Sequence, residues 1–370
     1  MSADRPPVLD AIGVISGTSM DGIDVAFIRS DGETSVEPGP GATYPYPGEV
    51  KRALREVVAH PERAREPLGD LERAVTDAHV DAVRAFLAQY SIEPAEIELV
   101  GLHGQTILHR PRERFTRQLC DGGRAASRLG LDVIADFRSA DIAAGGQGAP
   151  LAPLYHAAIS AGLPRPLMVL NWGGVGNVTY LGAEGEIVAF DTGPANAPLD
   201  DFIARRRGVT HDEGGELAAS GRVDREMVEG FMRDPYFELP APKSLDRNHF
   251  HALAREVETL GDEDGAATLA AFTIEATAAA LRHVVGQPSR WLVCGGGRRN
   301  LTLMRALGIR LDARVEPIEA IGYDGDVIEA QCFAYLALRS RRGLPLSLPT
   351  TTGAPRPMQG GVFWPAPKAA

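Results

Sequence analysis

The chain has 370 residues, enough for two domains of ordinary size, and 44% of them are hydrophobic, which allows a full core. Its net charge of −11, without a long basic run, argues against nucleic acid or an anionic membrane surface as a partner. The N-terminal sequence has no apolar leader, no stretch approaches the roughly 18 apolar residues of a spanning helix, and three scattered cysteines exclude a full disulfide framework. A cytoplasmic location is therefore expected.

Two short apolar runs, at residues 12–15 and 23–28, flank a polar turn at 16–22, and this pattern predicts a β-hairpin. The two glycines of the turn allow positive φ, so that its N–H groups can converge on one point. The hydroxyls and carboxylates of this segment belong to Ser16, Thr18, Ser19, Asp21 and Asp24. N–H groups and hydroxyls suit phosphate oxygens, and carboxylates suit Mg²⁺. These residues alone fit a phosphate site and a surface hairpin without a ligand equally well.

The segments expected next are a strand over 34–44, helices over 49–60 and 67–90, and strands over 98–102 and 131–135. The longer helix has apolar residues at three- and four-residue steps, as is typical of an amphipathic helix. The strand over 98–102 runs into a polar cluster at 103–106, a position where α/β folds place ligand contacts. A glycine-rich break at 145–150 marks the expected end of the first domain.

The second half repeats the pattern with which the chain opens. A strand over 167–170, a polar glycine turn at 171–177 and a returning strand over 178–181 precede a strand over 187–190, which ends at Asp191. Because strand, polar glycine turn and strand open both halves, we predict an internal duplication.

The remaining segments complete the second domain. They are a partly helical stretch over 199–219, a buried helix over 269–285, a strand over 291–294, a glycine turn at 295–297 and an apolar helix over 327–338. Glu329 is the anomaly in that last helix. From Gly343 the chain is rich in proline and threonine. The predicted division is accordingly 1–150, 151–345 and a loose tail at 346–370.

Three common catalytic motifs fail at specific positions. Gly17 and Gly22 have the Walker A glycine spacing, but Ile23 and Asp24 stand where Lys and Ser or Thr are required. No G-x-G-x-x-G follows a predicted strand, and residues 17–21 lack the final glycine of the G-x-S-x-G nucleophile elbow. P-loop NTPases, dinucleotide oxidoreductases and serine hydrolases are therefore disfavoured.

Two glycine-turn hairpins, an acidic strand end and a later run of three glycines before a helix form the plan of the actin/hexokinase/sugar-kinase superfamily. Six segments go further, in this order: SGTSMDGID, GLHGQT, DFRSADIAAGGQGAPL, LNWGGVGN, FDTGPAN and CGGGRRN. In wording and order they resemble the 1,6-anhydro-N-acetylmuramic acid kinase family. Each segment alone is weak evidence for the family. The six together, in the same order and with fitting spacing, cover nearly the whole chain and make the resemblance specific.

The resemblance implies an α/β fold of two duplicated actin/hexokinase-like, or ribonuclease H-like, domains with a cleft between them. It implies a bacterial enzyme of cell-wall recycling that uses ATP and Mg²⁺. Water would open the 1,6-anhydro bridge while O6 takes the γ-phosphoryl group, giving N-acetylmuramate 6-phosphate and ADP. The expected partner is a small sugar, without nucleic acid or membrane, and relatives suggest a homodimer.

The resemblance also implies roles for single residues. The ATP phosphate loop would comprise Gly17, Thr18, Ser19, Met20, Asp21, Gly22, Ile23 and Asp24, with Asp21 and Asp24 as the metal ligands. The other nucleotide contacts would be Gly173, Gly174, Gly176, Asn177, Gly295, Gly296 and Gly297. The substrate contacts would be His103, Arg138, Asp141 and Glu329, and the catalytic base would be Asp191.

The residues themselves leave other interpretations open. Asp191 could belong to an Asx-type turn rather than take a proton from water, and His103 could be a core or turn histidine. Glu329 could pair with an arginine or reach a sugar hydroxyl. Arg138 could join a structural ion pair or bind a lactyl carboxylate. The glycines at 295–297 could admit adenosine or simply begin a helix.

Two segments depart from the family pattern. FDTGPAN has Ala195 where the family has glycine, and alanine would add strain if this position required positive φ. The loop after Pro242 reads KSLDRN in place of KSTGRE, which changes Leu245, Asp246 and Asn248. The substrate therefore stays open, and the alternatives are an ordinary sugar kinase or a nucleotide- or sugar-binding sensor that has lost catalysis.

Overall fold

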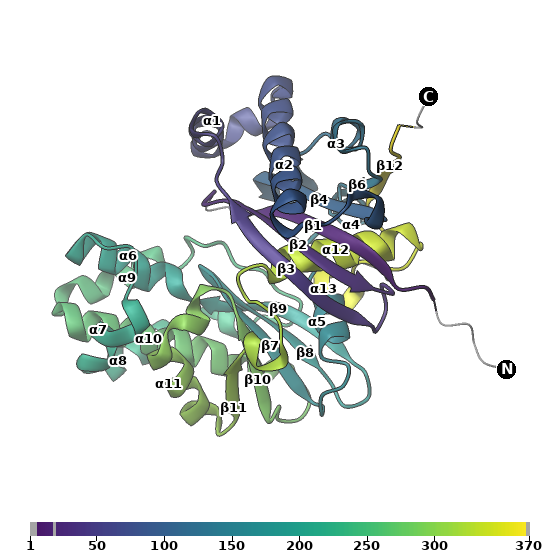
Figure 1. Ribbon diagram of the computed structural model, residues 1–370. Helices are drawn as coiled ribbons and strands as arrows, with labels where there is room; N and C mark the ends of the chain where they lie inside the picture. The colour runs from purple at the N-terminus through teal and green to yellow at the C-terminus, as the bar shows by residue number, and fades with distance from the viewer. Residues whose placement is uncertain (1–5, 18–19, 368–370) are drawn as a thin grey trace. The chain divides into compact units, whose positions relative to one another are not determined.

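The computed structural model describes residues 6–17 and 20–367, which divide into two compact units. The first unit comprises Met1–Gly162 and Val327–Ala370, and the second comprises Leu163–Asp326. The chain therefore leaves the first unit, forms the second, and returns to the first for its last segment (Figure 1).

These limits differ from the expected domains 1–150, 151–345 and 346–370. Helix α12 (Ile328–Arg341), expected in the second domain, packs on strands of the first unit and also contacts α5 (Pro153–Ile159). The tail expected to be loose forms helix α13 (Pro349–Thr352) and strand β12 (Val362–Trp364) in the same unit. It is ordered because β12 pairs with a strand of the sheet and Trp364 covers Gly122, where a Cβ would lie 2.3 Å from the indole ring.

Within the described residues, the first unit has a seven-stranded sheet in the order β12–β6–β4–β1–β2–β3, with β5 beside β4. Besides β12, its strands are β1 (Leu9–Ser16), β2 (Ile23–Ser30), β3 (Val36–Tyr44), β4 (Leu99–Arg110), β5 (Phe115–Leu119) and β6 (Val133–Ala135). Strands β1, β2 and β3 are antiparallel, which confirms the predicted hairpin, and β4 and β6 run parallel to β1 and β4. The polar cluster at 103–106 lies inside β4 rather than after it, because pairing with β5 extends that strand to Arg110.

Helices cover both faces of this sheet (Figure 1). One face carries α1 (Gly48–Ala59), α2 (Gly69–Tyr90) and α3 (Gly122–Leu129), and the other face carries α12. Side chains alternate across a strand, so Ile12 and Val14 of β1 join the apolar cluster of α2 while Gly13 faces α12. Cβ atoms on Gly13 and on Gly101 of β4 would lie 1.7 and 2.2 Å from backbone carbonyl oxygens of α12. Glycine at both positions therefore lets the helix backbone lie directly on β1 and β4.

The second unit has, in its described residues, a five-stranded sheet in the order β11–β10–β7–β8–β9. Its strands are β7 (Leu167–Trp172), β8 (Val175–Leu181), β9 (Ile187–Pro194), β10 (Arg290–Cys294) and β11 (Arg314–Pro317). Strands β7, β8 and β9 are antiparallel, while β10 and β11 run parallel to β7 and β10. Strands β3–β2–β1–β4–β6 of the first unit have the same order and directions, which confirms the predicted duplication. This arrangement is typical of the actin/hexokinase superfamily. The predicted α/β class is confirmed, and the sheet of each unit is mixed.

The helices of the second unit are α6 (Asn196–Arg207), α7 (Glu216–Ser220), α8 (Arg225–Phe231), α9 (His251–Glu256), α10 (Asp262–Ala279) and α11 (Leu301–Leu311). The predicted buried helix corresponds to α10, which contacts α6, α7, α8, α11 and β9. The glycine turn expected over 171–177 is confined to Gly173 and Gly174, because β7 and β8 extend through the flanking residues.

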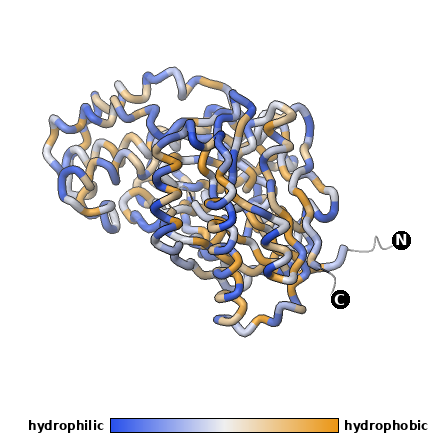
Figure 2. Tube along the Cα trace, turned by 90° about the horizontal axis from the view of Figure 1, so that it is seen from above, coloured by the Kyte–Doolittle hydropathy of each residue, from blue (hydrophilic) through white to orange (hydrophobic). Residues whose placement is uncertain are grey.

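Hydrophobic and hydrophilic residues interleave along the whole trace (Figure 2). Buried apolar side chains instead gather in a core in each unit, with Phe86 and Val100 in the first and Trp172 and Phe272 in the second. Among the residues that the structure describes, no helix is both long and apolar enough to cross a membrane.

Gly101→Ala should lower the free energy of unfolding by about 1–3 kcal/mol, because its Cβ overlaps the Phe333 carbonyl oxygen and α12 must shift. Gly230→Ala is the control, since Gly230 is an exposed position of α8 with no atom within 4 Å of a Cβ. There, alanine should be neutral or stabilise by up to about 1 kcal/mol. Urea unfolding of both variants measures the difference, and equal midpoints would contradict the direct contact of α12 with the sheet.

Candidate functional site

The turn between β1 and β2 closes through the Met20 N–H, which donates to the Gly17 carbonyl oxygen at 3.1 Å. Met20 has a φ of 57°, a left-handed conformation that few side chains adopt. Thr18 and Ser19, predicted to contact phosphate, lie outside the described residues. The turn is confirmed, and its phosphate contact stays a prediction.

Gln105 fixes the start of this turn from the neighbouring strand β4, where it is paired with Ser16. Its side chain is fully buried. Oε1 accepts from the Ser16 hydroxyl at 2.7 Å and the Tyr46 hydroxyl at 3.3 Å, and Nε2 donates to the Gly17 carbonyl oxygen at 3.1 Å. The sequence placed Gln105 in a polar cluster without a role. Its role depends on the parallel pairing of β1 with β4.

The predicted metal ligands lie beside this turn. Asp21 is exposed, and Asp24 accepts a hydrogen bond of 2.6 Å from the Thr43 hydroxyl. The described residues include no group of three His, Cys, Asp or Glu side chains around one point. Mg²⁺ is commonly held by one or two carboxylates together with substrate phosphates and water, so this donor set fits a magnesium ion that arrives with a nucleotide.

His103, which is buried, and Arg138, which is half-buried, form a pair on the α12 side of the same sheet. The Arg138 Nε donates to His103 Nε2 at 2.9 Å, so the imidazole proton must lie on Nδ1, which is 3.0 Å from the Gly104 carbonyl oxygen. The imidazole lies 4.4 Å from the Phe333 ring of α12, centre to centre. Burial and the Arg138 charge hold the pKa of His103 well below its usual range. His103 is therefore neutral and suited to positioning Arg138.

Glu329, in the first turn of α12, belongs to the same group. Arg138 donates from Nη1 to the Gly148 carbonyl oxygen at 2.7 Å, while Nη2 has no partner among the described residues. The Glu329 side chain reaches solvent, but the protein around it reduces its hydration and raises its pKa, an effect that the Arg138 charge opposes. The structure thus brings together three of the four predicted substrate contacts.

Asp141, the fourth, is buried and bound by protein donors. Oδ1 accepts from the Gly148 N–H at 2.7 Å, and Oδ2 accepts from the hydroxyls of Thr352, at 2.7 Å, and Ser347. The Gly148 carbonyl oxygen accepts from Arg138, so the Asp141 carboxylate helps to position Arg138 indirectly, by binding the Gly148 N–H. The structure accounts for Asp141 as a buried support, whereas a direct substrate contact stays a prediction.

In the second unit, two glycine segments lie beside the end of β7. The Gly173 and Gly174 carbonyl oxygens accept from the N–H groups that begin α6, at 3.0 and 3.1 Å. Cβ atoms on Gly295 and Gly297 would lie 2.3 and 2.5 Å from side-chain atoms of Asn171 and Trp172. Gly176 and Asn177 follow in β8. The predicted nucleotide contacts of this unit are therefore neighbours, and Gly295 and Gly297 approach β7 too closely for larger residues.

Asp191 lies at a bulge near the end of β9. Asn177 pairs with Asp191 and Gly176 pairs with Gly193, so Thr192 is an extra residue that re-aims the strand. The carboxylate Oδ2 accepts from the Leu245 N–H at 2.8 Å, and Oδ1 has no partner among the described residues. Burial raises the pKa of Asp191 to about 7, although the Leu245 hydrogen bond opposes the rise. A carboxylate with one fixed and one free oxygen and a near-neutral pKa suits a general base.

Ala195 does not have the positive φ that would strain an alanine. Its φ is −123°, and its side chain is buried in the core of the second unit. The condition under which the sequence predicted strain at this position is therefore not met in this chain.

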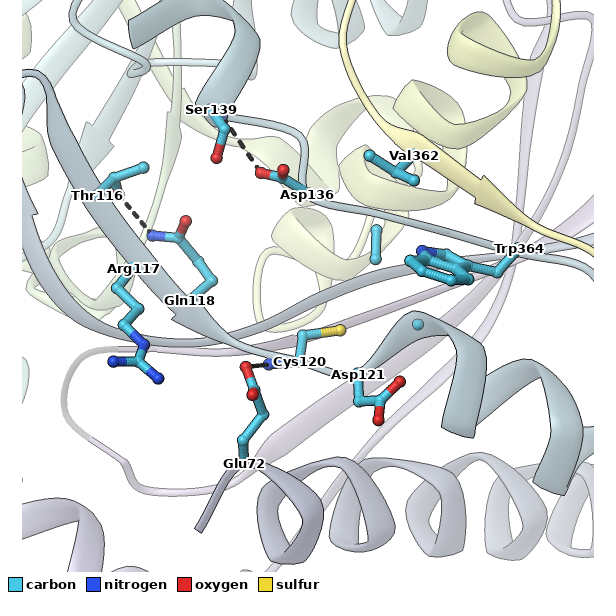
Figure 3. Close-up of a pocket in the computed structure, with 12 residues that line it drawn as sticks. Glu72, Thr116, Arg117, Gln118, Cys120, Asp121, Asp136, Ser139, Val362 and Trp364 are labelled. Carbon is cyan, nitrogen blue, oxygen red and sulfur yellow. Dashed lines mark hydrogen bonds between the residues drawn. The ribbon is translucent and has the colours of Figure 1, made fainter. Parts of the chain in front are cut away.

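A pocket of about 390 Å³ lies on the other face of the first sheet, between α2, α3 and β12 (Figure 3). Glu72, Asp121, Asp136 and Trp364 are among the side chains that line it, and Glu72 accepts from the Cys120 N–H. None of the predicted site residues that the structure describes lines this pocket. It is therefore separate from the group of His103, Arg138 and Glu329.

The duplicated topology and the glycine turn in the first hairpin of each unit are typical of the sugar-kinase class of phosphotransferases. The profile of the anhydro-N-acetylmuramic acid kinase family matches residues 10–366. The chain belongs to this family, whose members are kinases that act on a sugar.

Curated relatives agree over nearly their full length. The anhydro-N-acetylmuramic acid kinase of Rhodospirillum rubrum is 52% identical over 359 residues, which cover 96% of this chain and 94% of the relative. That of Acidiphilium cryptum is 49% identical, covering 98% of this chain and 100% of the relative. Among solved structures, component A of (R)-2-hydroxyglutaryl-CoA dehydratase from Acidaminococcus fermentans has a TM-score of 0.48 and 12% identity, covering 90% of this chain and 99% of that one.

Gln105→Leu should lower the free energy of unfolding by about 2–4 kcal/mol, because the Ser16 hydroxyl and the Gly17 carbonyl oxygen lose buried partners. Gln89→Leu is the control, since Gln89 is exposed and, among the described residues, its side chain accepts a single hydrogen bond, from the Tyr44 hydroxyl. It should change stability by less than about 1 kcal/mol. Urea unfolding measures both, and a Gln105→Leu variant as stable as Gln89→Leu would show that Gln105 does not fix the turn.

Proposed function

We propose that this protein transfers the γ-phosphoryl group of ATP to O6 of 1,6-anhydro-N-acetylmuramic acid and opens the anhydro bridge in the same reaction. The products are N-acetylmuramate 6-phosphate and ADP, which places the enzyme in cell-wall recycling. The observation that carries the proposal is the Asp191 carboxylate, with Oδ2 held by the Leu245 N–H and Oδ1 free. Family membership supplies the substrate class.

Asp191 acts on water in this proposal. Oδ1 takes a proton from a water molecule, whose oxygen then bonds to C1 as the C1–O6 bond breaks. The released O6 attacks the γ-phosphorus, and the bond from that phosphorus to the ADP oxygen breaks. A positioned carboxylate base typically contributes about 10²–10⁴ in rate. Because the pKa of Asp191 lies near 7, the carboxylate form is available at neutral pH and still accepts a proton readily.

The nucleotide would be bound mainly by backbone groups. In the first unit, the turn from Gly17 to Asp24 would contact the phosphates, and in the second unit Gly173, Gly174 and the glycines at 295–297 would contact the rest of the nucleotide. Mg²⁺ held by Asp21 and Asp24 would neutralise phosphate charge. Phosphoryl transfer needs chiefly positioning and charge neutralisation, which suits these backbone-rich sites.

The sugar would be bound by the group on the α12 side of the first sheet. Arg138 Nε and Nη1 are held by His103 and Gly148, and Nη2 has no hydrogen-bond partner in the described part of the chain, so the guanidinium is oriented before the lactyl carboxylate arrives. Glu329 would accept from a sugar hydroxyl. The predicted homodimer and the cytoplasmic location stay predictions.

The second candidate is an ordinary sugar kinase. The reason to consider it is that the loop beside Asp191 departs from the family pattern at Leu245, Asp246 and Asn248. The third is a sensor that binds nucleotide and sugar without turnover, for the same reason. These three candidates differ in what happens to solvent oxygen.

With ATP, the anhydro-sugar and ¹⁸O-water, the protein should form ADP and a sugar phosphate that carries ¹⁸O at C1 from the transfer step, as mass spectrometry would show. Bridge opening takes the C1 oxygen from water, whereas phosphorylation of a free hydroxyl does not. Early time points and a control with N-acetylmuramate exclude later exchange at C1. Phosphate transfer without the label would support the ordinary kinase, and sugar binding without ADP formation would support the sensor.

Asp191→Asn should reduce kcat about 10²–10⁴-fold while the variant still binds ATP. For the wild type, kcat/KM should rise with pH up to about 7 and then level off, since only the deprotonated carboxylate accepts the proton. The control is Asp312→Asn, an exposed helix-capping position in the same unit, which should retain full activity and the same pH limb. Near-normal turnover by Asp191→Asn would exclude Asp191 as the base.

A further inference from the structure

Asp191 is held through its main chain as well as its carboxylate. Its N–H donates to the Lys243 carbonyl oxygen at 2.9 Å, and its carbonyl oxygen accepts from the Tyr236 hydroxyl at 2.6 Å. With the Leu245 N–H on Oδ2, three residues from one segment after β9 bind Asp191 at three points. We call Tyr236, Lys243 and Leu245 the Asp191 frame. It leaves Oδ1 as the carboxylate oxygen without a partner among the described residues.

Lys243 has an unusual environment within this frame. Its side chain is only 8% exposed, and no described carboxylate forms an ion pair with it. Nζ donates to the Tyr236 carbonyl oxygen at 3.0 Å, and lies 3.4 Å from the Phe237 carbonyl oxygen and 3.2 Å from His283 Nε2. Two of the three ammonium donors therefore have carbonyl acceptors, and the third faces His283 Nε2, which also lies 3.2 Å from the Phe237 carbonyl oxygen. Burial lowers the pKa of Lys243 to about 8, which shows the cost of placing the charge here.

The contacts of Lys243, Tyr236 and Asp191 form a closed cycle. The Lys243 ammonium holds the Tyr236 carbonyl oxygen, the Tyr236 hydroxyl holds the Asp191 carbonyl oxygen, and the Asp191 N–H holds the Lys243 carbonyl oxygen. The ammonium also lies 4.6 Å from the centre of the Tyr236 ring. The lysine side chain therefore ties together the two parts of the frame that contact β9, residues 235–238 and 243–245.

We propose that Lys243 is a positioning residue that acts through the Asp191 frame to direct the Asp191 carboxylate and keep Oδ1 available to accept a proton. Lys243 does not reach the carboxylate itself. Its effect passes through the Tyr236 hydroxyl and the Leu245 N–H. This inference rests on the proposed role of Asp191 as the base, but the geometry of the frame does not depend on the identity of the sugar.

The test compares Lys243→Met and Tyr236→Phe with Tyr180→Phe. Methionine keeps the length and apolar stem of lysine but removes the ammonium group. Tyr236→Phe removes only the hydroxyl on the Asp191 carbonyl oxygen. Tyr180→Phe is the matched control, because the Tyr180 hydroxyl also donates to a backbone carbonyl oxygen of the second unit, that of Val285.

The first measurement is the pKa of the Asp191 carboxyl by ¹³C NMR, with the resonance identified by its loss in Asp191→Asn. Lys243→Met should raise that pKa by about one pH unit, because the Leu245 N–H no longer stabilises the carboxylate as well. Tyr180→Phe should leave it unchanged. The other charged or titratable groups around the frame, His283, Tyr236, Glu238 and Arg282, are retained in Lys243→Met.

The second measurement is the kinetics with ATP and the anhydro-sugar. Lys243→Met should lower kcat about tenfold or more and move the acid limb of the pH profile upward, while KM for ATP stays within about twofold. Tyr236→Phe should lower kcat about three- to tenfold. A variant that merely loses stability would reduce the folded fraction without moving the pH limb.

The outcomes separate this inference from the proposed function. If the wild type does not turn over the sugar, the proposed function fails, and the carboxyl titration still decides whether the frame acts on Asp191. If Lys243→Met has the Asp191 pKa and the kcat of Tyr180→Phe, the positioning role is overturned. If Lys243→Met does not fold, Tyr236→Phe decides: a kcat equal to that of Tyr180→Phe overturns the inference.

Discussion

The direct contact between the backbone of α12 and the strands β1 and β4 organises the first unit. Gly13 and Gly101 leave no side chains at this interface, and a Cβ at either position would overlap a helix carbonyl oxygen. The contact sets the depth of the helix, and with it the position of Glu329 in its first turn. One turn further, Phe333 packs against His103 and lies 5.8 Å from the Arg138 guanidinium. The two glycines, by allowing this close contact, thus determine where Glu329 and Phe333 lie relative to Arg138.

Each group proposed to bind or react with a substrate is held in place by a buried polar residue that has no proposed role in catalysis. Gln105 fixes the start of the turn at Gly17, Asp141 fixes the loop whose carbonyl holds Arg138, and Lys243 fixes the segment that binds Asp191. A buried polar atom without a partner is costly, so these supports are satisfied on nearly every atom. The unused atoms, Arg138 Nη2 and Asp191 Oδ1, belong to the groups that would meet a substrate. The presence or absence of hydrogen-bond partners thus distinguishes the supporting residues from the groups proposed to bind substrate.

Local patterns in the sequence predict the hairpin, the helices α2 and α10 and the duplication, because each depends on periodicity or turn residues close in the chain. The return of α12 to the first unit could not be predicted, since it depends on a contact between Gly13 and residues more than three hundred positions later. Strands β5 and β12 are short and were missed for a similar reason. The resemblance supplied the candidate site residues, whereas Gln105 and Lys243 act through hydrogen bonds that only the folded chain reveals.

Neither departure from the family pattern removes a hydrogen bond of Asp191. Ala195 has a φ of −123°, so the positive φ that would strain alanine does not occur. Leu245 contacts Asp191 through its N–H, a donor that every residue except proline supplies, and Asp246 and Asn248 are exposed. The changed loop therefore keeps the hydrogen bond to the Asp191 carboxylate while its side chains vary. Because the contact of Asp191 with the loop does not depend on the changed side chains, these changes give no structural reason to prefer a sensor without turnover over a kinase of the family.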